Sequence, residues 1–173
     1  MSKVITFSRV FPAYHPRKGE STYFVEKLSK GFPEYSAEDF TPLKSRPTMD
    51  LFSLMVLAID KWADLQPKYH TIRSASRWKE GEKFSPRVWS GKPYASKMIT
   101  IAPDIEITKL MDFEIKDECV FIDGELYAYS SSTEALALLA LNDGLSLGDM
   151  IGWFKCLKPF KGQIICWNDS ITY

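Results

Sequence analysis

The sequence predicts an α+β fold of mostly antiparallel strands with helices at the periphery. Short segments in which apolar and polar residues alternate, as they do in half-buried strands, are unevenly interspersed with a few helical segments. The regular strand–helix alternation of a doubly wound parallel sheet is absent. A chain of 173 residues that is 45% hydrophobic and 14% aromatic has enough apolar side chains for one packed domain over residues 1–173.

The N-terminal segment predicts a strand followed by a helix. Residues 3–10 alternate apolar and polar side chains from a β-branched start, which is typical of a strand. Two prolines and a glycine within 12–19 predict a loop. Ser21 or Thr22 can cap a helix that runs to Gly31, because their hydroxyls accept from the first helical N–H groups and glycine favours a helix end.

The middle of the chain predicts an irregular segment, a helix and several strands. Residues 32–47 contain three prolines and no clear period. Apolar residues at helical spacing then predict a helix over 48–65, which Pro67 terminates. Residues 82–90 and 97–116 are predicted as strands, and the second range is long enough to hold two of them.

The last third of the chain predicts a hairpin, two helices and a final strand. The hairpin spans 119–129, because an Asp-Gly pair separates two apolar runs within it. An S-x-x-E capping box predicts a helix over 131–142. A second such signal, S-x-x-D at 146–149, opens another helix, and residues 163–167 predict the last strand.

Charge is unevenly distributed along the chain, although the net charge is zero. Residues 1–100 carry 17 Lys and Arg against 10 Asp and Glu, whereas residues 101–173 carry 5 against 12. Within 68–97 the counts are 8 and 2, which suits an anionic partner such as nucleic acid or a phosphate. A solvated face gives the same pattern, and a neutral protein is not a strong non-specific binder of polyanions.

The cysteines, the histidines and the apolar stretches indicate the cellular compartment and whether a metal or cofactor is expected. The three cysteines lack disulfide or zinc spacing, so we expect reduced thiols at Cys119, Cys156 and Cys166. No signal-peptide pattern opens the chain, and the longest apolar stretch, 51–59, is too short for a bilayer. His15 and His70, the only histidines, show no ligand spacing. We expect a cytoplasmic protein without metal, cofactor or membrane partner.

Lys68, Thr71 and Arg73 form the most informative pattern of the sequence. The spacing K-x-x-T-x-R brings together an amine, a hydroxyl and a guanidinium, which can hold a polar, nucleotide-like molecule. If Ile72 is the buried residue of a strand, Thr71 and Arg73 share the opposite face, because side chains alternate along a strand. An ordinary exposed strand edge carries the same residue types, and spacing alone favours that interpretation.

The K-x-x-T-x-R pattern, with Trp78 and a Gly-acidic step at 81–82 after it, resembles the signature of the ASCH domain family. The resemblance implies a small domain of PUA-like fold, a β-barrel of mixed, mostly antiparallel strands with peripheral helices. The family pattern usually has a glycine where Gln66 stands here. Compact members pass almost directly from the first helix to this strand, which makes residues 32–66 a predicted helical insertion.

The resemblance also supplies catalytic candidates. In enzymes of the family that hydrolyse acetylated cytidine, a carboxylate precedes a short helix near the chain end, and Asp143 takes that place here. Lys68 would act as the base that activates Thr71, a poor nucleophile on its own. Arg73 would hold a carbonyl oxygen or a phosphate, and Asp143 would protonate the leaving amine or orient Lys68. As an isolated Asp-Gly pair, Asp143 and Gly144 equally predict a simple turn.

Binding without chemistry is the function that we expect first. Aromatic and basic side chains interleave after the signature, where the rings can stack on bases and the cations can contact phosphates. The resemblance to PUA-like domains, which commonly recognise RNA, implies the same use here. We predict a cleft for RNA or a modified nucleoside or nucleotide, with ligand-binding residues Tyr69, Arg77, Trp78, Trp89 and His15. Metal-independent amide hydrolysis of acylated cytidine-like nucleosides is the alternative. A third is a protein–protein adaptor that uses the apolar face of helix 48–65.

Overall fold

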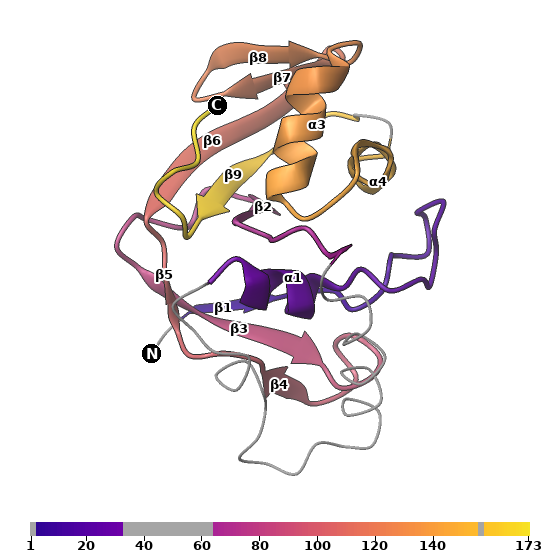
Figure 1. Ribbon diagram of the computed structural model, residues 1–173, viewed down its shortest axis with the longest axis vertical. Helices are drawn as coiled ribbons and strands as arrows, with labels where there is room; N and C mark the ends of the chain where they lie inside the picture. The colour runs from indigo at the N-terminus through magenta and orange to yellow at the C-terminus, as the bar shows by residue number, and fades with distance from the viewer. Residues whose placement is uncertain (1–2, 33–63, 156–157) are drawn as a thin grey trace.

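The computed structural model describes residues 3–32, 64–155 and 158–173, which form two β-sheets and three helices (Figure 1). The predicted α+β class is therefore confirmed. Within these residues the strands do not close into a barrel, so the PUA-like barrel stays a prediction. The predicted helix 48–65 and the insertion 32–66 fall almost entirely outside the described residues.

The first sheet is built around β3, with the N-terminal strand beside it. Its strands are β1 (Lys3–Thr6), β3 (Lys83–Trp89), β4 (Met98–Thr100) and β5 (Ile105–Glu106). β1 runs parallel to β3, whereas β4 and β5 both pair antiparallel with β3. The pairing of β1 continues to Phe7, whose N–H donates to Arg87 O at 2.7 Å, and the predicted strand 3–10 is shorter than expected.

The second sheet is antiparallel and has five strands in the order β2-β9-β6-β7-β8. Its strands are β2 (His70–Ser74), β6 (Lys109–Lys116), β7 (Cys119–Ile122), β8 (Glu125–Tyr129) and β9 (Phe160–Cys166). The signature strand β2 lies at one edge and pairs with β9, with Thr71 opposite Ile165 and Arg73 opposite Gln163. One side of the signature strand therefore has no strand neighbour within the sheet.

Three helices complete the described part of the chain: α1 (Phe24–Lys30), α3 (Thr133–Asn142) and α4 (Leu147–Trp153). Ser146 caps α4 as predicted, because its Oγ accepts from Asp149 N at 3.1 Å. The predicted capping box of α3 is wrong. The helix starts one residue later, after Ser132, whose Oγ accepts from Tyr129 N at 3.1 Å and is thereby bound to the preceding strand.

No single helix among the described residues is long and apolar enough to cross a membrane. The two helices α3 and α4 reach the required length and apolarity only when taken together, across a bend of 82°.

Aromatic side chains from both sheets pack where the sheets meet. Phe7 follows β1, Phe84 lies on β3, and Trp167 follows β9; their ring centroids are 5.8–6.5 Å apart. All three side chains are buried, and full burial of a large apolar side chain contributes about 1.5–3 kcal/mol. This cluster holds the first sheet against the β2–β9 edge of the second. The site described below lies in that junction.

Candidate functional site

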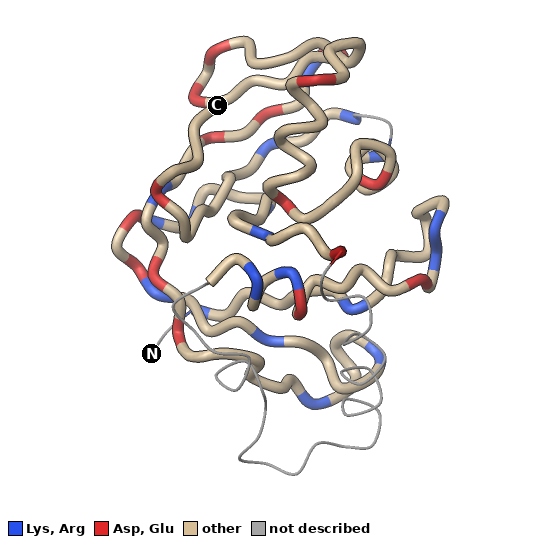
Figure 2. The backbone as a smooth tube through the Cα atoms, viewed as in Figure 1, with Lys and Arg blue, Asp and Glu red and all other residues tan. Residues whose placement is uncertain are grey.

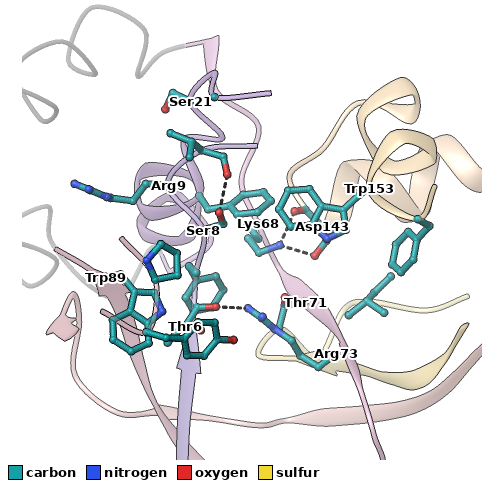
Figure 3. Close-up of a pocket in the computed structure, with 18 of the residues that line it drawn as sticks. Thr6, Ser8, Arg9, Ser21, Lys68, Thr71, Arg73, Trp89, Asp143 and Trp153 are labelled. Atoms are coloured by element: carbon teal, nitrogen blue, oxygen red, sulfur yellow. Dashed lines mark hydrogen bonds and ion pairs between the residues drawn. The ribbon is translucent and has the colours of Figure 1, made fainter. Parts of the chain in front are cut away.

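A pocket of about 460 Å³ opens between the two sheets and takes its lining from both (Figure 3). β1 supplies Thr6 and the edge strand β2 supplies Thr71 and Arg73, while the β3–β4 loop and the end of α4 complete the wall. Lys68 and Asp143 also line it. The structure thus brings the four predicted catalytic candidates to one pocket.

Lys68 is fixed by contacts of its backbone before β2 begins. Its N–H donates to Lys27 O in α1 at 2.8 Å, and its carbonyl accepts from Trp167 Nε1 at 3.1 Å. Gly31 makes this approach possible, because a Cβ there would overlap the carbonyl oxygen of Lys68. The glycine that the sequence predicted as a helix end therefore also gives the signature segment its place against α1.

Asp143 and Gly144 form the turn that ends α3 and faces Lys68. Gly144 has φ +71°, a left-handed conformation that glycine adopts without strain. Its carbonyl accepts from Lys27 Nζ at 2.6 Å, and the neighbouring carbonyl of Asn142 accepts from Tyr69 N at 2.8 Å. Asp143 thus fulfils both predictions, because the turn that it forms with Gly144 places its carboxylate beside Lys68.

The ammonium of Lys68 forms an ion pair with the carboxylate of Asp143 and donates to Asp143 O at 2.6 Å. It also lies 4.3 Å from the ring centroid of Phe24. Only 1% of the Lys68 side chain is exposed, and this burial lowers its pKa to about 8. Burial likewise raises the pKa of Asp143. The amine is therefore close to the pKa that a base needs near neutral pH.

Thr71 and Arg73 both point from β2 toward the pocket (Figure 3), but Ile72, predicted as the buried residue between them, is only half-buried and lines the pocket too. Thr71 Oγ1 has no hydrogen-bond partner among the described residues, so its hydroxyl is available to a ligand. Arg73 Nη2 donates to Thr6 O at 2.7 Å and its guanidinium lies 5.5 Å from the Phe7 ring. Burial lowers the pKa of Arg73, and its Nε is buried with no acceptor within the described residues.

His70 and Tyr173 lie behind the ion pair and were not predicted to take part. His70 Nδ1 lies 3.6 Å from Asp143 Oδ1, and its Nε2 is 2.6 Å from the Tyr173 hydroxyl. Burial holds the pKa of His70 well below its usual range, so the ring is neutral at physiological pH. Asn142 Nδ2 donates to the same hydroxyl at 3.1 Å. These groups form a buried polar cluster behind Asp143, in which His70 Nδ1 has no hydrogen-bond partner within the described residues.

Of the five predicted ligand-binding residues, Trp89 lines the main pocket. Its ring centroid lies 5.3 Å from that of Tyr94, which lines the pocket as well and is 91% exposed. Arg77 and Trp78 instead line a second pocket of about 350 Å³. Tyr69 lines neither pocket and packs half-buried against the core.

His15, which was predicted as a ligand-binding residue, lines neither pocket. Its ring is buried and stacks on Phe11 with centroids 4.3 Å apart. Nδ1 accepts from Arg17 N at 3.0 Å, so the other nitrogen carries the proton and Nε2 donates to Asp149 O at 2.9 Å. His15 thus fastens the 12–19 loop to α4, because both of its nitrogens are already used by the backbone.

Sequence reasoning missed the contribution of β1 to the site. Thr6 at the end of β1 and Ser8 just after it both line the main pocket. The signal was present, because Ile5 and Phe7 are buried and the polar residues that alternate with them must face away from that core. Nothing in the sequence alone indicated that this face looks onto β2.

The basic stretch 68–97 does not form one continuous face (Figure 2). Lys68 and Arg73 are directed into the pocket, whereas Lys83 lies outside it, 3.7 Å from a carboxylate oxygen of Glu106. Lys and Arg positions are spread over both sheets, and acidic positions follow β6 to β8 (Figure 2). Among the described residues of this stretch, the cations that line a pocket are Lys68, Arg73 and Arg77.

No group of three His, Cys, Asp or Glu residues within the described parts of the chain is placed to hold a metal ion. The chain matches no known family model, no curated protein and no solved structure. The inference of function therefore depends on the geometry of the site and on the resemblance of its motif.

Proposed function

We propose that the protein is an ASCH-type domain of PUA-like fold that binds a modified nucleoside in the pocket between the sheets. The observation that carries the proposal is the convergence of Lys68, Thr71, Arg73 and Asp143 on one pocket, with Trp89 and Tyr94 beside them. Its volume of about 460 Å³ falls within the range of about 300–1,000 Å³ that small-molecule sites occupy.

Each part of the pocket suits one part of such a ligand. The aromatic pair Trp89 and Tyr94 offers ring faces for a base. The free Thr71 hydroxyl and the Arg73 guanidinium offer donors for a carbonyl oxygen. A pocket of this volume favours one nucleoside over a long single strand, which needs a basic groove along its backbone.

Hydrolysis of an acylated amine is the second candidate, favoured by the Lys68–Asp143 pair. Neutral Lys68 would take the proton of Thr71 as Oγ1 bonds to the amide carbonyl carbon. The C–N bond would then break as the ammonium of Lys68 returns a proton to the leaving amine. Water would release the acyl group from Thr71 as a carboxylic acid, and Arg73 would stabilise the oxyanion in both steps.

The decisive experiment combines binding and turnover on purified protein. Wild type, Lys68→Ala and the control Lys83→Ala are titrated with acetylcytidine and assayed for release of cytidine and acetate. We expect wild type and Lys83→Ala to bind and Lys68→Ala to bind at least tenfold more weakly. Turnover that is lost only in Lys68→Ala establishes the hydrolase. Absence of binding by wild type rejects the nucleoside proposal.

Two further assignments remain proposals. An RNA partner would show as binding of an oligonucleotide that weakens steeply with salt and with Arg73→Ala. The adaptor function depends on helix 48–65, outside the described residues, and would be tested by co-purification with that helix deleted. The cytoplasmic location is likewise a prediction from the sequence.

A further inference from the structure

The second pocket directly adjoins the first. Its volume is about 350 Å³, and Thr6, Arg73 and Tyr94 line both pockets. Arg77 and Trp78 belong to the second pocket alone. A ligand larger than a nucleoside can therefore extend from one pocket into the other past the Arg73 guanidinium.

The second pocket carries positive charge that no carboxylate of its own lining balances. Arg73 and Arg77 both line it, and no Asp or Glu does. Burial lowers the pKa of Arg73 most, the Asp143 carboxylate in the first pocket raises it, and Arg77 lowers it again by a smaller amount. Neither arginine has an ion pair within the described residues. Two guanidiniums held together in this way repel each other unless an anion lies between them.

Buried donors without acceptors occur on the same wall. Arg73 Nε and Trp78 Nε1 are both buried and have no hydrogen-bond partner within the described residues. Leaving a buried donor unsatisfied costs about 1–3 kcal/mol, so each of these groups calls for an explanation, and a bound water or ion is one. Glu82 does not line this pocket, and its carboxylate accepts from Lys3 Nζ at 2.7 Å, whose ammonium also donates to Arg77 O at 2.8 Å.

We propose that the second pocket binds the terminal phosphate of a nucleotide whose base occupies the first pocket. This inference rests on the proposed function and specifies it further: the ligand is a modified nucleoside monophosphate. Guanidinium groups match phosphate oxygens in a fork of paired hydrogen bonds, and two of them neutralise a phosphate dianion. Together the pockets have room for one nucleotide, which favours a mononucleotide over an internal residue of an RNA strand.

Isothermal titration at low salt tests the inference with three probes: acetylcytidine, its 5′-monophosphate, and a trinucleotide with acetylcytidine in the centre. In wild type we expect the monophosphate to bind at least tenfold more tightly than the nucleoside. In Arg77→Met that ratio falls to nearly one, because the methionine keeps the apolar stem and removes the charge. Lys79→Met, a change of a neighbouring exposed cation outside the lining, keeps the ratio.

Each other result has a defined meaning. Equal affinity of wild type for nucleoside and monophosphate overturns the phosphate site and leaves the nucleoside proposal intact. A trinucleotide that binds as tightly as the monophosphate overturns the assignment to a terminal phosphate. If no nucleoside binds, inorganic phosphate is titrated by NMR: shifts at Arg73 and Trp78 that vanish in Arg77→Met uphold the anion site, and their absence overturns it.

Discussion

Lys68 is the residue on which the site depends most, because a fully buried lysine needs specific compensation. Its ammonium has three partners: the Asp143 carboxylate, the Asp143 carbonyl and the ring face of Phe24. A buried pair of this kind contributes little net stability compared with an apolar pair, but it strongly penalises the loss of either partner. A functional role for the amine therefore accounts for the buried pair better than a contribution to stability does.

Asp143→Asn should destabilise the fold, because it leaves Lys68 buried without a counter-charge. We expect the free energy of unfolding in urea at pH 7 to fall by roughly 3 kcal/mol. The double variant Lys68→Met with Asp143→Asn is the control, and it should recover at least half of that loss since no buried charge remains. A loss below about 1 kcal/mol in the single variant would contradict the ion pair.

The lowered pKa of Lys68 predicts a stability that increases with pH in the alkaline range. The folded-state pKa of about 8 lies below the ordinary 10.5, so between these values the unfolded chain binds more protons. The contribution of Lys68 to stability therefore rises from pH 8 to 10.5, by up to about 3 kcal/mol. The raised pKa of Asp143 acts with the opposite sign, starting in the acid range.

Urea unfolding of wild type and of the Lys68→Met, Asp143→Asn double variant at pH 7.5, 9 and 10 measures this effect as a difference. Ionisable groups common to both proteins contribute equally and cancel in the difference. The free energy of unfolding of wild type should therefore increase relative to that of the double variant as the pH rises. A difference that stays constant over this range would mean that Lys68 titrates near its ordinary pKa.

At the scale of elements, β9 positions the signature strand by a very close backbone approach. Gly162 in β9 faces Ser74 in the register, and a Cβ there would overlap the carbonyl oxygen of Arg73. Any side chain at this position must push β2 away from β9. The catalytic and binding candidates of β2 would move with it.

Gly162→Ala is therefore expected to reduce stability by more than about 2 kcal/mol and to weaken ligand binding. Gly148→Ala in α4 is the matched control, because a Cβ there meets only Ser146 Oγ at 4.0 Å. It should change stability by no more than about 0.5 kcal/mol, because Gly148 is an exposed residue in the first turn of α4. Melting temperatures of the two variants decide the matter, and equal effects would refute the close approach.

Elements with local signals were predictable from the sequence. The Asp123-Gly124 pair adopts φ of +51° and +82° between β7 and β8, as a two-residue hairpin turn requires. The start of α3 was missed because Ser132 bonds the end of β8, a contact that depends on how the helix follows the hairpin. The order of the strands in each sheet, including the parallel pairing of β1 with β3, could not be predicted from local sequence patterns.

At the scale of the whole molecule, the site is a product of long-range contacts. Lys68 and Asp143 are 75 residues apart, and only the resemblance of the motif suggested that they meet. Strand periodicity predicted that Thr71 and Arg73 share a face, but not that Thr6 lies opposite them. The second pocket was unpredictable for the same reason, because Arg77 and Trp78 acquire their place only when β1 packs beside β2.

Arg73 joins the two sheets, and its loss should therefore be felt on both sides of the pocket. The guanidinium extends from β2 to the carbonyl of Thr6 in β1 and covers the Phe7 ring. Arg73→Met keeps the apolar contact with Phe7 and removes the hydrogen bond, so we expect the free energy of unfolding to fall by roughly 1–2 kcal/mol.

Hydrogen exchange in Arg73→Met should accelerate for the amides of β1 and β2 and stay unchanged in the distant β7–β8 hairpin. Lys83→Met, on the outside of β3, should alter neither region. Uniform acceleration in all strands would show that Arg73 supports global stability alone and does not act as a local link between the sheets.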